Sequence, residues 1–149
     1  MRITNQASDI LITYSLGSCV GVTIYDPMAC VGGMIHCMLP LSKIDPEKAK
    51  KSPAMFVDTG VPMLFEAAYR MGAAKSRIIL KVAGASCILD EKGTFKIGER
   101  NYAVLRKMLW KNNVLIAAED VGGALPRTMD LEIATGRVTI KSRGNIMEL

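Results

Sequence analysis

Two extended segments near the start of the chain, separated by a short turn, constrain its fold more than any other feature. Residues 19–25 are rich in β-branched and aromatic side chains and lack helical spacing, and residues 30–39 have the same character. Between them, residues 26–29 begin with Asp26 and Pro27, the order that a type I turn prefers. The sequence therefore predicts an antiparallel hairpin, and with it at least one β-sheet.

The hairpin also predicts which side chains lie beside each other. With a four-residue loop Tyr25 faces Cys30, and Cys19 then lies directly opposite His36, with Cβ atoms about 4.5–5.5 Å apart. His36 is the only histidine of the chain. A change of one residue in the loop length would instead pair Cys19 with Cys37 and separate the thiol from the imidazole. The opposite, apolar face of the hairpin is predicted to carry Val20, Val22, Ile24, Val31 and Ile35.

A cysteine beside a histidine is the minimal equipment for nucleophilic acyl chemistry. The imidazole lowers the pKa of the thiol, takes its proton and later gives that proton to a leaving amine. Gly17 permits a tight backbone path before Cys19, and Ser18 is small, so backbone N–H groups of this turn can stabilise an oxyanion. The alternative is structural, because free cysteines are among the most buried residue types and His36 could simply satisfy a hydrogen bond.

Chain length and hydropathy limit the number of domains and the classes of protein to which the chain can belong. A chain of 149 residues is long enough for one domain with a substantial core. Half of the residues are hydrophobic, but no apolar run approaches the roughly 18 residues that a membrane span needs. Residues 1–9 contain no apolar h-region, so no signal peptide is predicted.

Cysteine spacing and charge argue against a disulfide scaffold, a zinc site and a nucleic-acid-binding protein. The four cysteines form no Cys-x-x-Cys pair, which favours a reducing cytoplasm over a disulfide scaffold, and one histidine cannot complete a familiar zinc-ligand set. No metal site is therefore predicted, and the cysteine–histidine chemistry needs no organic cofactor. The net charge of +5 favours acidic partners, but Lys and Arg are scattered and no nucleic-acid reader motif is present. An acidic protein substrate and a merely solvated surface explain the charge equally well.

Periodicity and turn signals predict the remaining elements. Apolar residues at three- and four-residue steps predict helices over residues 60–71 and 99–112. Strands are predicted over residues 10–14, 77–83, 114–118, 128–133 and 138–141, with a polar surface loop over residues 40–53 and further loops around residues 92–93 and 119–123. Strands outnumber helices, and neighbouring strands are joined by hairpins. The sequence thus predicts an α+β fold, with a mixed, largely antiparallel sheet core and helices packed outside it.

Seven short motifs, spread along the chain, carry a family resemblance. They are LGSCV (16–20), YDP (25–27), GGMIH (32–36), MLP (38–40), IGERN (97–101), AEDVGG (118–123) and TGRV (135–138). In identity and order they are similar to the signature of the CheD family, the chemoreceptor glutamine deamidases of bacterial and archaeal chemotaxis. The resemblance covers almost the whole chain and implies a single CheD-like deamidase domain over residues 1–149.

The resemblance implies a fold and a set of site residues. The expected fold is a layered α-β-α sandwich similar to the cytotoxic necrotizing factor-type cysteine deamidases. Cys19 is implied to be the nucleophile and His36 the general base, with Thr13 orienting the imidazole. Backbone groups near Gly17 and Ser18 are the expected oxyanion donors. Without the resemblance Thr13 would be an ordinary strand residue.

The resemblance also implies an activity and partners. The expected activity is deamidation of specific glutamines of methyl-accepting chemoreceptors to glutamate through a cysteine thioester, in the cytoplasm. A second implied partner is CheC, a phosphatase that acts on the phosphorylated response regulator CheY. The alternatives are a non-catalytic adaptor that binds receptors or CheC, and a general Cys-His amidase or protease. The three site residues are all present, which favours an active enzyme over an adaptor.

One segment departs from the family pattern, and one loop has no assigned role. Relatives commonly show Lys-x-x-Gly-Gly-Ala, whereas residues 81–85 end in Gly84-Ala85, one glycine short. The contribution of this segment to the site is therefore left open. For Gly122 and Gly123, a tight turn that needs glycine and a substrate contact are both compatible with the sequence.

Overall fold

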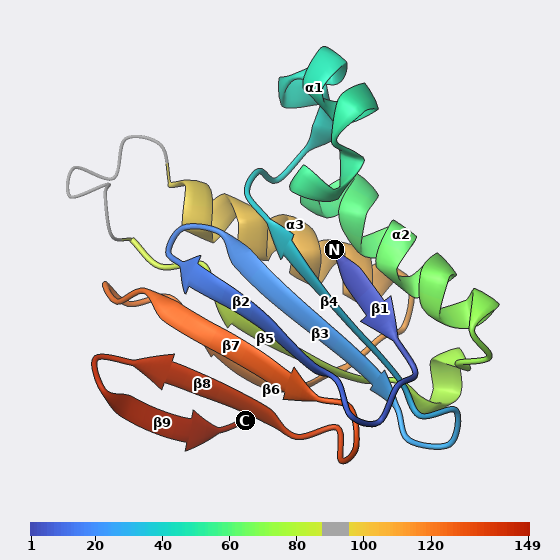
Figure 1. Cartoon of the computed structure of the whole chain (residues 1–149). Helices are drawn as coiled ribbons and strands as arrows, with labels where there is room; N and C mark the ends of the chain where they lie inside the picture. The colour runs from blue at the N-terminus through green and yellow to red at the C-terminus, as the bar shows by residue number, and fades with distance from the viewer. Residues whose placement is uncertain (88–95) are drawn as a thin grey trace.

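The structure, a computed structural model, describes residues 1–87 and 96–149, and its strands form two sheets (Figure 1). The five-stranded sheet has the order β1-β4-β3-β5-β6, built from β1 (Arg2–Thr4), β4 (Val31–Cys37), β3 (Val20–Asp26), β5 (Ile79–Gly84) and β6 (Ile116–Val121). The four-stranded sheet has the order β2-β7-β8-β9, built from β2 (Ile10–Leu16), β7 (Arg127–Glu132), β8 (Val138–Ser142) and β9 (Asn145–Glu148). Among these described strands only β5 and β6 pair in parallel, which confirms the predicted mixed, largely antiparallel character.

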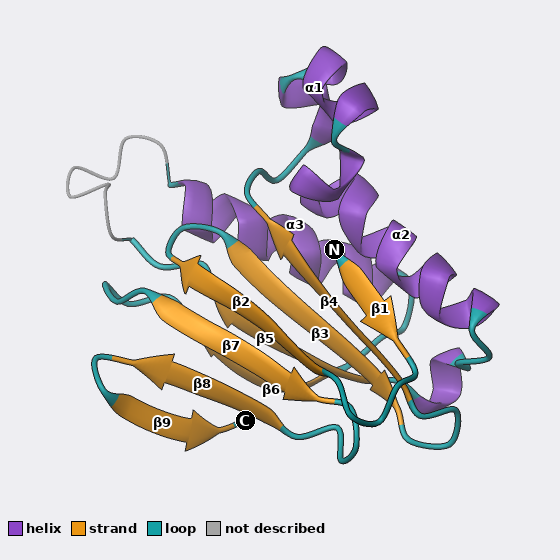
Figure 2. Ribbon diagram, viewed as in Figure 1, coloured by secondary structure: helices purple, strands orange, loops and turns teal. Residues whose placement is uncertain are grey.

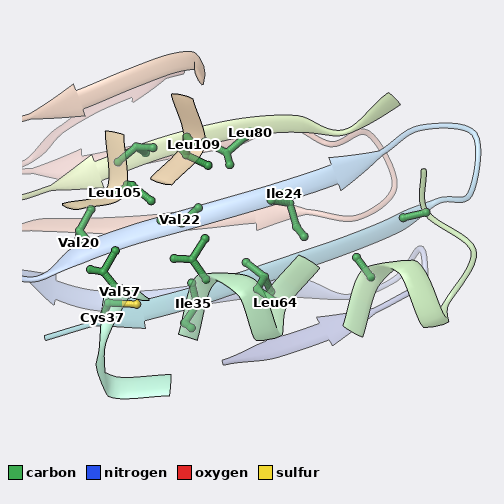
Figure 3. Close-up of a cluster of buried hydrophobic side chains, with 14 of the residues drawn as sticks. Val20, Val22, Ile24, Ile35, Cys37, Val57, Leu64, Leu80, Leu105 and Leu109 are labelled. Atoms are coloured by element: carbon green, nitrogen blue, oxygen red, sulfur yellow. The ribbon is translucent and has the colours of Figure 1, made fainter. Parts of the chain in front are cut away.

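Helices cover one face of the five-stranded sheet, and the four-stranded sheet covers the other (Figure 2). The two long helices are α2 (Val57–Arg70) and α3 (Ile97–Lys111), whereas α1 (Pro46–Lys51) is short and contributes no buried residue. The apolar cluster between helices and sheet, drawn in Figure 3, includes Val20, Val22, Ile24, Ile35, Leu64 and Leu105. Among the described residues, no helix combines the length and the hydropathy needed to cross a bilayer.

The α+β class is confirmed, but the expected α-β-α order of layers is wrong. The observed order is helices, five-stranded sheet, four-stranded sheet. Both faces of β3 are buried, so the five-stranded sheet needs a cover on each side, and α2 and α3 lie together on one of them. The second cover comes from strands such as β7, which alternates buried and half-buried residues as a strand with one apolar face does. The sequence pattern identified these strands but not their separation into a second sheet.

Several element bounds differ from the predicted ones. α2 begins at Val57 rather than at Gly60. The prediction of a surface loop over residues 40–53 is wrong in part, because α1 forms there: the Asp45 side chain accepts a hydrogen bond from the Lys48 N–H, and Pro46 stands in the first turn. The short strands β1 and β9 at the sheet edges are not predicted by the sequence pattern. The loop expected around residues 92–93 lies outside the described residues.

The predicted hairpin of β3 and β4 is present, but its predicted register is wrong. Tyr25 pairs with Gly32 rather than with Cys30, a shift of two residues. Cys19 therefore does not lie directly opposite His36. Because side chains alternate between the two faces of a strand, a shift of two residues leaves every side chain on its predicted face. The predicted apolar face of the hairpin accordingly lies in the cluster under the helices.

Asp26 explains the observed register. It remains in β3, and its carboxylate accepts hydrogen bonds from the N–H groups of Met28 and Ala29, so the loop consists of residues 27–30. The same buried carboxylate accepts a hydrogen bond from the Ala74 N–H and forms an ion pair with Arg77. The Arg77 guanidinium holds the pKa of Asp26 well below its usual range. One side chain thus ties the hairpin loop to the segment that follows α2.

We expect Asp26→Asn to destabilise the protein by about 2 kcal/mol, because charge-assisted hydrogen bonds are lost while the partly exposed Arg77 can return to water. The folded-state pKa lies below the unfolded value of about 3.9, so this contribution is complete above that pH and is lost as the pH falls below it. Urea unfolding between pH 3 and pH 7 should show a smaller loss of stability toward acid in the variant. Glu47→Gln, which removes an exposed ion pair, is the control and should change little. Equal acid sensitivity of the variant and the wild type would contradict this assignment.

Candidate active site

The connection between β2 and β3 carries Cys19 from one sheet to the other. β2 ends at Leu16 in the four-stranded sheet, and β3 begins at Val20 in the five-stranded sheet. The pairing of β2 with β7 is interrupted between Thr13 and Leu16, where Ser15 adopts a positive φ of 56°. Such irregularities commonly re-aim side chains beside functional sites. Cys19 lies half-buried in the resulting turn, immediately before β3.

The imidazole of His36 is held from the opposite sheet. His36 lies in β4, and its Nδ1 is 2.9 Å from Oγ1 of Thr13 in β2. This hydrogen bond joins β4 of the five-stranded sheet to β2, an edge strand of the four-stranded sheet. The structure therefore brings together Thr13 and His36, the pair that the family resemblance implied.

Cys19 packs against the apolar cluster between the two sheets, the side of the five-stranded sheet on which Met34 and His36 of β4 lie, and the strand continuation would make it a diagonal neighbour of His36. Gly21 pairs with His36, and Cys19 precedes Gly21 by two residues, a relation in which Cα atoms are about 7–8 Å apart. Gly21 has no side chain, and a Cβ atom there would lie 2.7 Å from Cδ1 of Leu16, so Leu16 packs directly over this position. No hydrogen bond joins Cys19 to His36 among the described residues. Catalytic hydrogen bonds often tighten only when substrate binds.

Burial sets the protonation of both groups in the resting site. Burial raises the pKa of the Cys19 thiol, and the backbone N–H of the same residue opposes this rise. Burial also lowers the pKa of His36, and the positive N-terminal amino group lowers it further. The resting pair is therefore a neutral thiol and a neutral imidazole. This differs from the sequence-based expectation that the imidazole lowers the pKa of the thiol, because desolvation dominates.

We expect iodoacetamide to alkylate Cys19 slowly at neutral pH and faster as the pH rises, with a half-maximal rate above pH 9.0, because burial keeps the thiol protonated. Peptide mass spectrometry measures the rate. The fully buried Cys37, whose pKa burial raises to about 12, is an internal reference that should stay unmodified. A Cys19 rate that is already maximal at pH 7 would instead indicate a thiolate–imidazolium pair.

The segment after β5 holds the Cys19 turn through its backbone. The Ala85 N–H donates to the Cys19 carbonyl at 2.7 Å, and the Ser86 N–H donates to the Gly17 carbonyl at 2.8 Å. Ala85 has a φ of 54°, the left-handed conformation that favours glycine, and it stands where relatives commonly have their second glycine. The backbone thus follows the glycine-like path although the glycine is missing. Gly84 is indispensable here, since a Cβ atom would lie 2.4 Å from the Cys19 carbonyl oxygen.

The loop at Gly122 and Gly123 supports this segment in turn. The Gly122 N–H donates to the Gly84 carbonyl, and the Gly123 carbonyl accepts a hydrogen bond from the Cys87 N–H. Both glycines have positive φ values, 79° and 68°, which explains the residue type. The nearly buried guanidinium of Arg127 donates to the Gly122 carbonyl and to the Ser86 hydroxyl. These contacts favour a structural role for the loop.

Two backbone donors of the turn are free to receive a ligand atom. The N–H groups of Ser18 and Cys19 donate to no other residue of the part of the chain that the structure describes. The Gly17 N–H is not free, because it donates to the Ser15 carbonyl at 2.9 Å, and the positive φ of the turn falls at Ser15 rather than at Gly17. A cavity of about 380 Å³ opens beside the site, with Thr13 and His36 on its wall.

The site contains no obvious place for a metal ion. Across residues 1–87 and 96–149, no group of three or more His, Cys, Asp and Glu side chains is arranged to hold one. The groups that the site presents are a thiol, an imidazole bonded to a threonine, and the Ser18 and Cys19 backbone N–H groups.

Fold and site together define an α+β protein with a cysteine–histidine site at the junction of two sheets. A family model described as CheD chemotactic sensory transduction matches residues 38–142, and the chain belongs to the CheD family. "Probable chemoreceptor glutamine deamidase CheD 1" of Syntrophus aciditrophicus is 54% identical over 143 residues, 96% of this chain and 89% of the relative. "Probable chemoreceptor glutamine deamidase CheD" of Solibacter usitatus is 47% identical over 148 residues, 99% of this chain and 88% of the relative. The protein of that same name from Pyrococcus horikoshii is 36% identical over 147 residues, 96% of this chain and 90% of the relative.

Two residues of the site were not identified from the sequence. Asn101 reaches the Cys19 turn from α3, and Arg127 supports the segment after β5. The motif at residues 97–101 pointed to the neighbourhood of Asn101 without indicating a role. No local pattern distinguished Arg127 from the other basic residues.

Proposed function

We propose that the chain is a glutamine deamidase that converts specific glutamines of methyl-accepting chemoreceptors to glutamate. The observation that carries this proposal is the hydrogen bond between Thr13 and His36 on the sheet face that also carries Cys19. The names of its relatives supply the substrate class. Cys19 is the nucleophile, His36 the general base and Thr13 the residue that orients the imidazole.

The proposed reaction uses the neutral resting pair. If Nδ1–H of His36 donates to Oγ1 of Thr13, Nε2 is left free to accept the thiol proton. The sulfur then bonds to the carboxamide carbon of the glutamine, and the Ser18 and Cys19 N–H groups receive the oxyanion. The carbon–nitrogen bond breaks as His36 returns its proton to the departing ammonia, which leaves a thioester.

Hydrolysis completes the proposed cycle. His36 takes a proton from water, whose oxygen bonds to the thioester carbon, and the carbon–sulfur bond breaks with return of the proton to Cys19. Glutamine and water thus become glutamate and ammonia, and no redox partner is needed. The lowered pKa of His36 keeps the base neutral at physiological pH.

The remaining parts of the proposal concern the setting of the enzyme. Residues 1–149 are proposed to act as one deamidase domain in the cytoplasm, with kinship to the cytotoxic necrotizing factor deamidases. The net charge of +5 suits an acidic receptor surface. CheC is proposed as a second partner where the organism has one. Receptor or CheC binding that survives in Cys19→Ala would support an additional adaptor role.

We expect the wild type to convert receptor glutamines to glutamates, and Cys19→Ala to show no conversion, because no other group forms the thioester. Incubation with a chemoreceptor cytoplasmic fragment, followed by peptide mass spectrometry, measures the conversion. Cys30→Ala, which changes an exposed cysteine far from the turn, is the control and should keep full activity. Conversion by Cys19→Ala, or none by the wild type on a cognate receptor, would remove the proposed activity.

Thr13→Val should lower kcat by about 10- to 100-fold, since the imidazole loses the partner that orients it while the thiol remains. Steady-state rates on the same receptor fragment measure the change. Thr128→Val on β7 is the matched control and should stay within about twofold of the wild type. An unchanged rate in Thr13→Val would show that the hydrogen bond is dispensable for the reaction.

A further inference from the structure

The side chain of Asn101 joins the two strand ends that carry the reactive groups. Asn101 lies in α3 and is completely buried. Its Nδ2 donates to the carbonyl of Ser18, the residue before Cys19, at 2.9 Å, and to the carbonyl of Met38 at 3.2 Å. Met38 follows the end of β4, the strand of His36. One side-chain amide of α3 therefore hydrogen-bonds to both chain segments just beyond the last β3–β4 pair, Val20 and Cys37.

The contacts of Asn101 leave only one orientation of its amide. Both neighbours are carbonyl oxygens, so both must face the NH₂ group and the oxygen must point away. That oxygen, Oδ1, is buried and has no partner among the described residues. Native structures rarely retain an unsatisfied buried acceptor without a reason. The donors are therefore the part of this side chain that the fold requires.

The contact with Ser18 determines where the next N–H points. The chain has no cis peptide bond among the described residues, and in a trans peptide the C=O and the following N–H point in opposite directions. The Ser18 carbonyl is directed to Asn101, so the Cys19 N–H is directed away from α3. The same N–H lowers the pKa of the Cys19 thiol, against the larger effect of burial. It donates to no other described residue.

A glycine one turn earlier in α3 lets Asn101 reach this position. A Cβ atom on Gly98 would lie 2.6 Å from the Ala85 carbonyl oxygen, so the absence of a side chain allows α3 to lie against the segment after β5. Residues three apart share one face of a helix, so Asn101 projects toward the same part of the site as Gly98. The motif at residues 97–101 thus contains both Gly98, which allows α3 to approach the segment after β5, and Asn101, whose amide donates to the Cys19 turn.

We propose that Asn101 is a positioning residue that orients the Ser18–Cys19 peptide so that the Cys19 N–H faces the developing oxyanion. It does so while holding the Cys19 turn against the end of the His36 strand through the Met38 carbonyl. Asn101 touches neither the sulfur nor the substrate, and its effect is transmitted through the peptide plane. This role rests on the proposed deamidase function.

Asn101→Leu tests the role because leucine has the same branched shape and no donor. We expect kcat on the receptor fragment to fall by about 30- to 300-fold, near the loss that follows removal of one oxyanion donor. KM should stay within threefold of the wild type. The rate and pH profile of Cys19 alkylation by iodoacetamide should also stay within threefold, because that substitution forms no oxyanion. Asn112→Leu, at the exposed C-terminal end of the same helix, is the matched control and should keep the wild-type kcat.

Two results would overturn the role. One is a folded Asn101→Leu protein with a kcat within threefold of the wild type. The other is a parallel fall of kcat and of Cys19 alkylation, which would indicate a collapsed turn rather than a misdirected N–H. If Asn101→Leu does not fold, Asn101→Ala leaves room for a water molecule, and the same comparison is made with that variant.

Failure of the proposed function is distinguishable from failure of this role. A wild type that shows no Cys19-dependent deamidation would remove the function. Crystal structures of the wild type and of the folded Asn101 variant would then still show whether Asn101 orients the Ser18–Cys19 peptide. A rotated Ser18–Cys19 peptide in the variant would support the role, and an unchanged peptide would overturn it.

Discussion

Burial of β3, the central strand of the five-stranded sheet, on both faces is the constraint on which the rest of the structure depends. β3 is buried along its whole length, because α2 and α3 cover one face and the four-stranded sheet covers the other. Polar reactive groups inside such a sheet would be desolvated without access to a substrate. Strand ends give such groups access to solvent. Cys19 lies immediately before β3, and His36 lies next to the end of β4, so both occupy the same open edge.

The hydrogen bond from Thr13 to His36 couples this edge to the packing of the two sheets. One partner comes from each sheet, so the imidazole is oriented only when the sheets are in their native arrangement. The half-buried setting also explains the neutral resting pair. A thiolate and an imidazolium would both have to be desolvated, and burial shifts the pKa of each group toward its neutral form. In the proposed reaction the base therefore takes the thiol proton only when a substrate carbonyl is present to be attacked.

The sequence could predict the shared face of Cys19 and His36 but not their exact register. Alternation along β3 and β4 survives a shift of two residues, whereas the register depends on the Asp26 carboxylate remaining within its strand. Thr13 came only from the family resemblance, because a contact between two sheets leaves no local periodicity. The layer order was missed for a related reason: strand patterns show an apolar face without showing what covers it. The role of Asn101 could not be predicted from the sequence, because its two hydrogen-bond acceptors lie in distant parts of the chain.

The family motifs are far apart in sequence but converge on one short turn in space. Gly84 passes under the Cys19 carbonyl, where no side chain would fit, and Gly98 allows α3 to approach the same segment. The loop at Gly122 and Gly123 holds that segment from the other side. Residues that do not belong to the proposed catalytic set therefore hold the backbone at Cys19 in place. Many hairpins can place a thiol and an imidazole together, but fixing the peptide before the proposed nucleophile needs this surrounding set. On the proposed function, this is why the motifs extend well beyond Cys19 and His36.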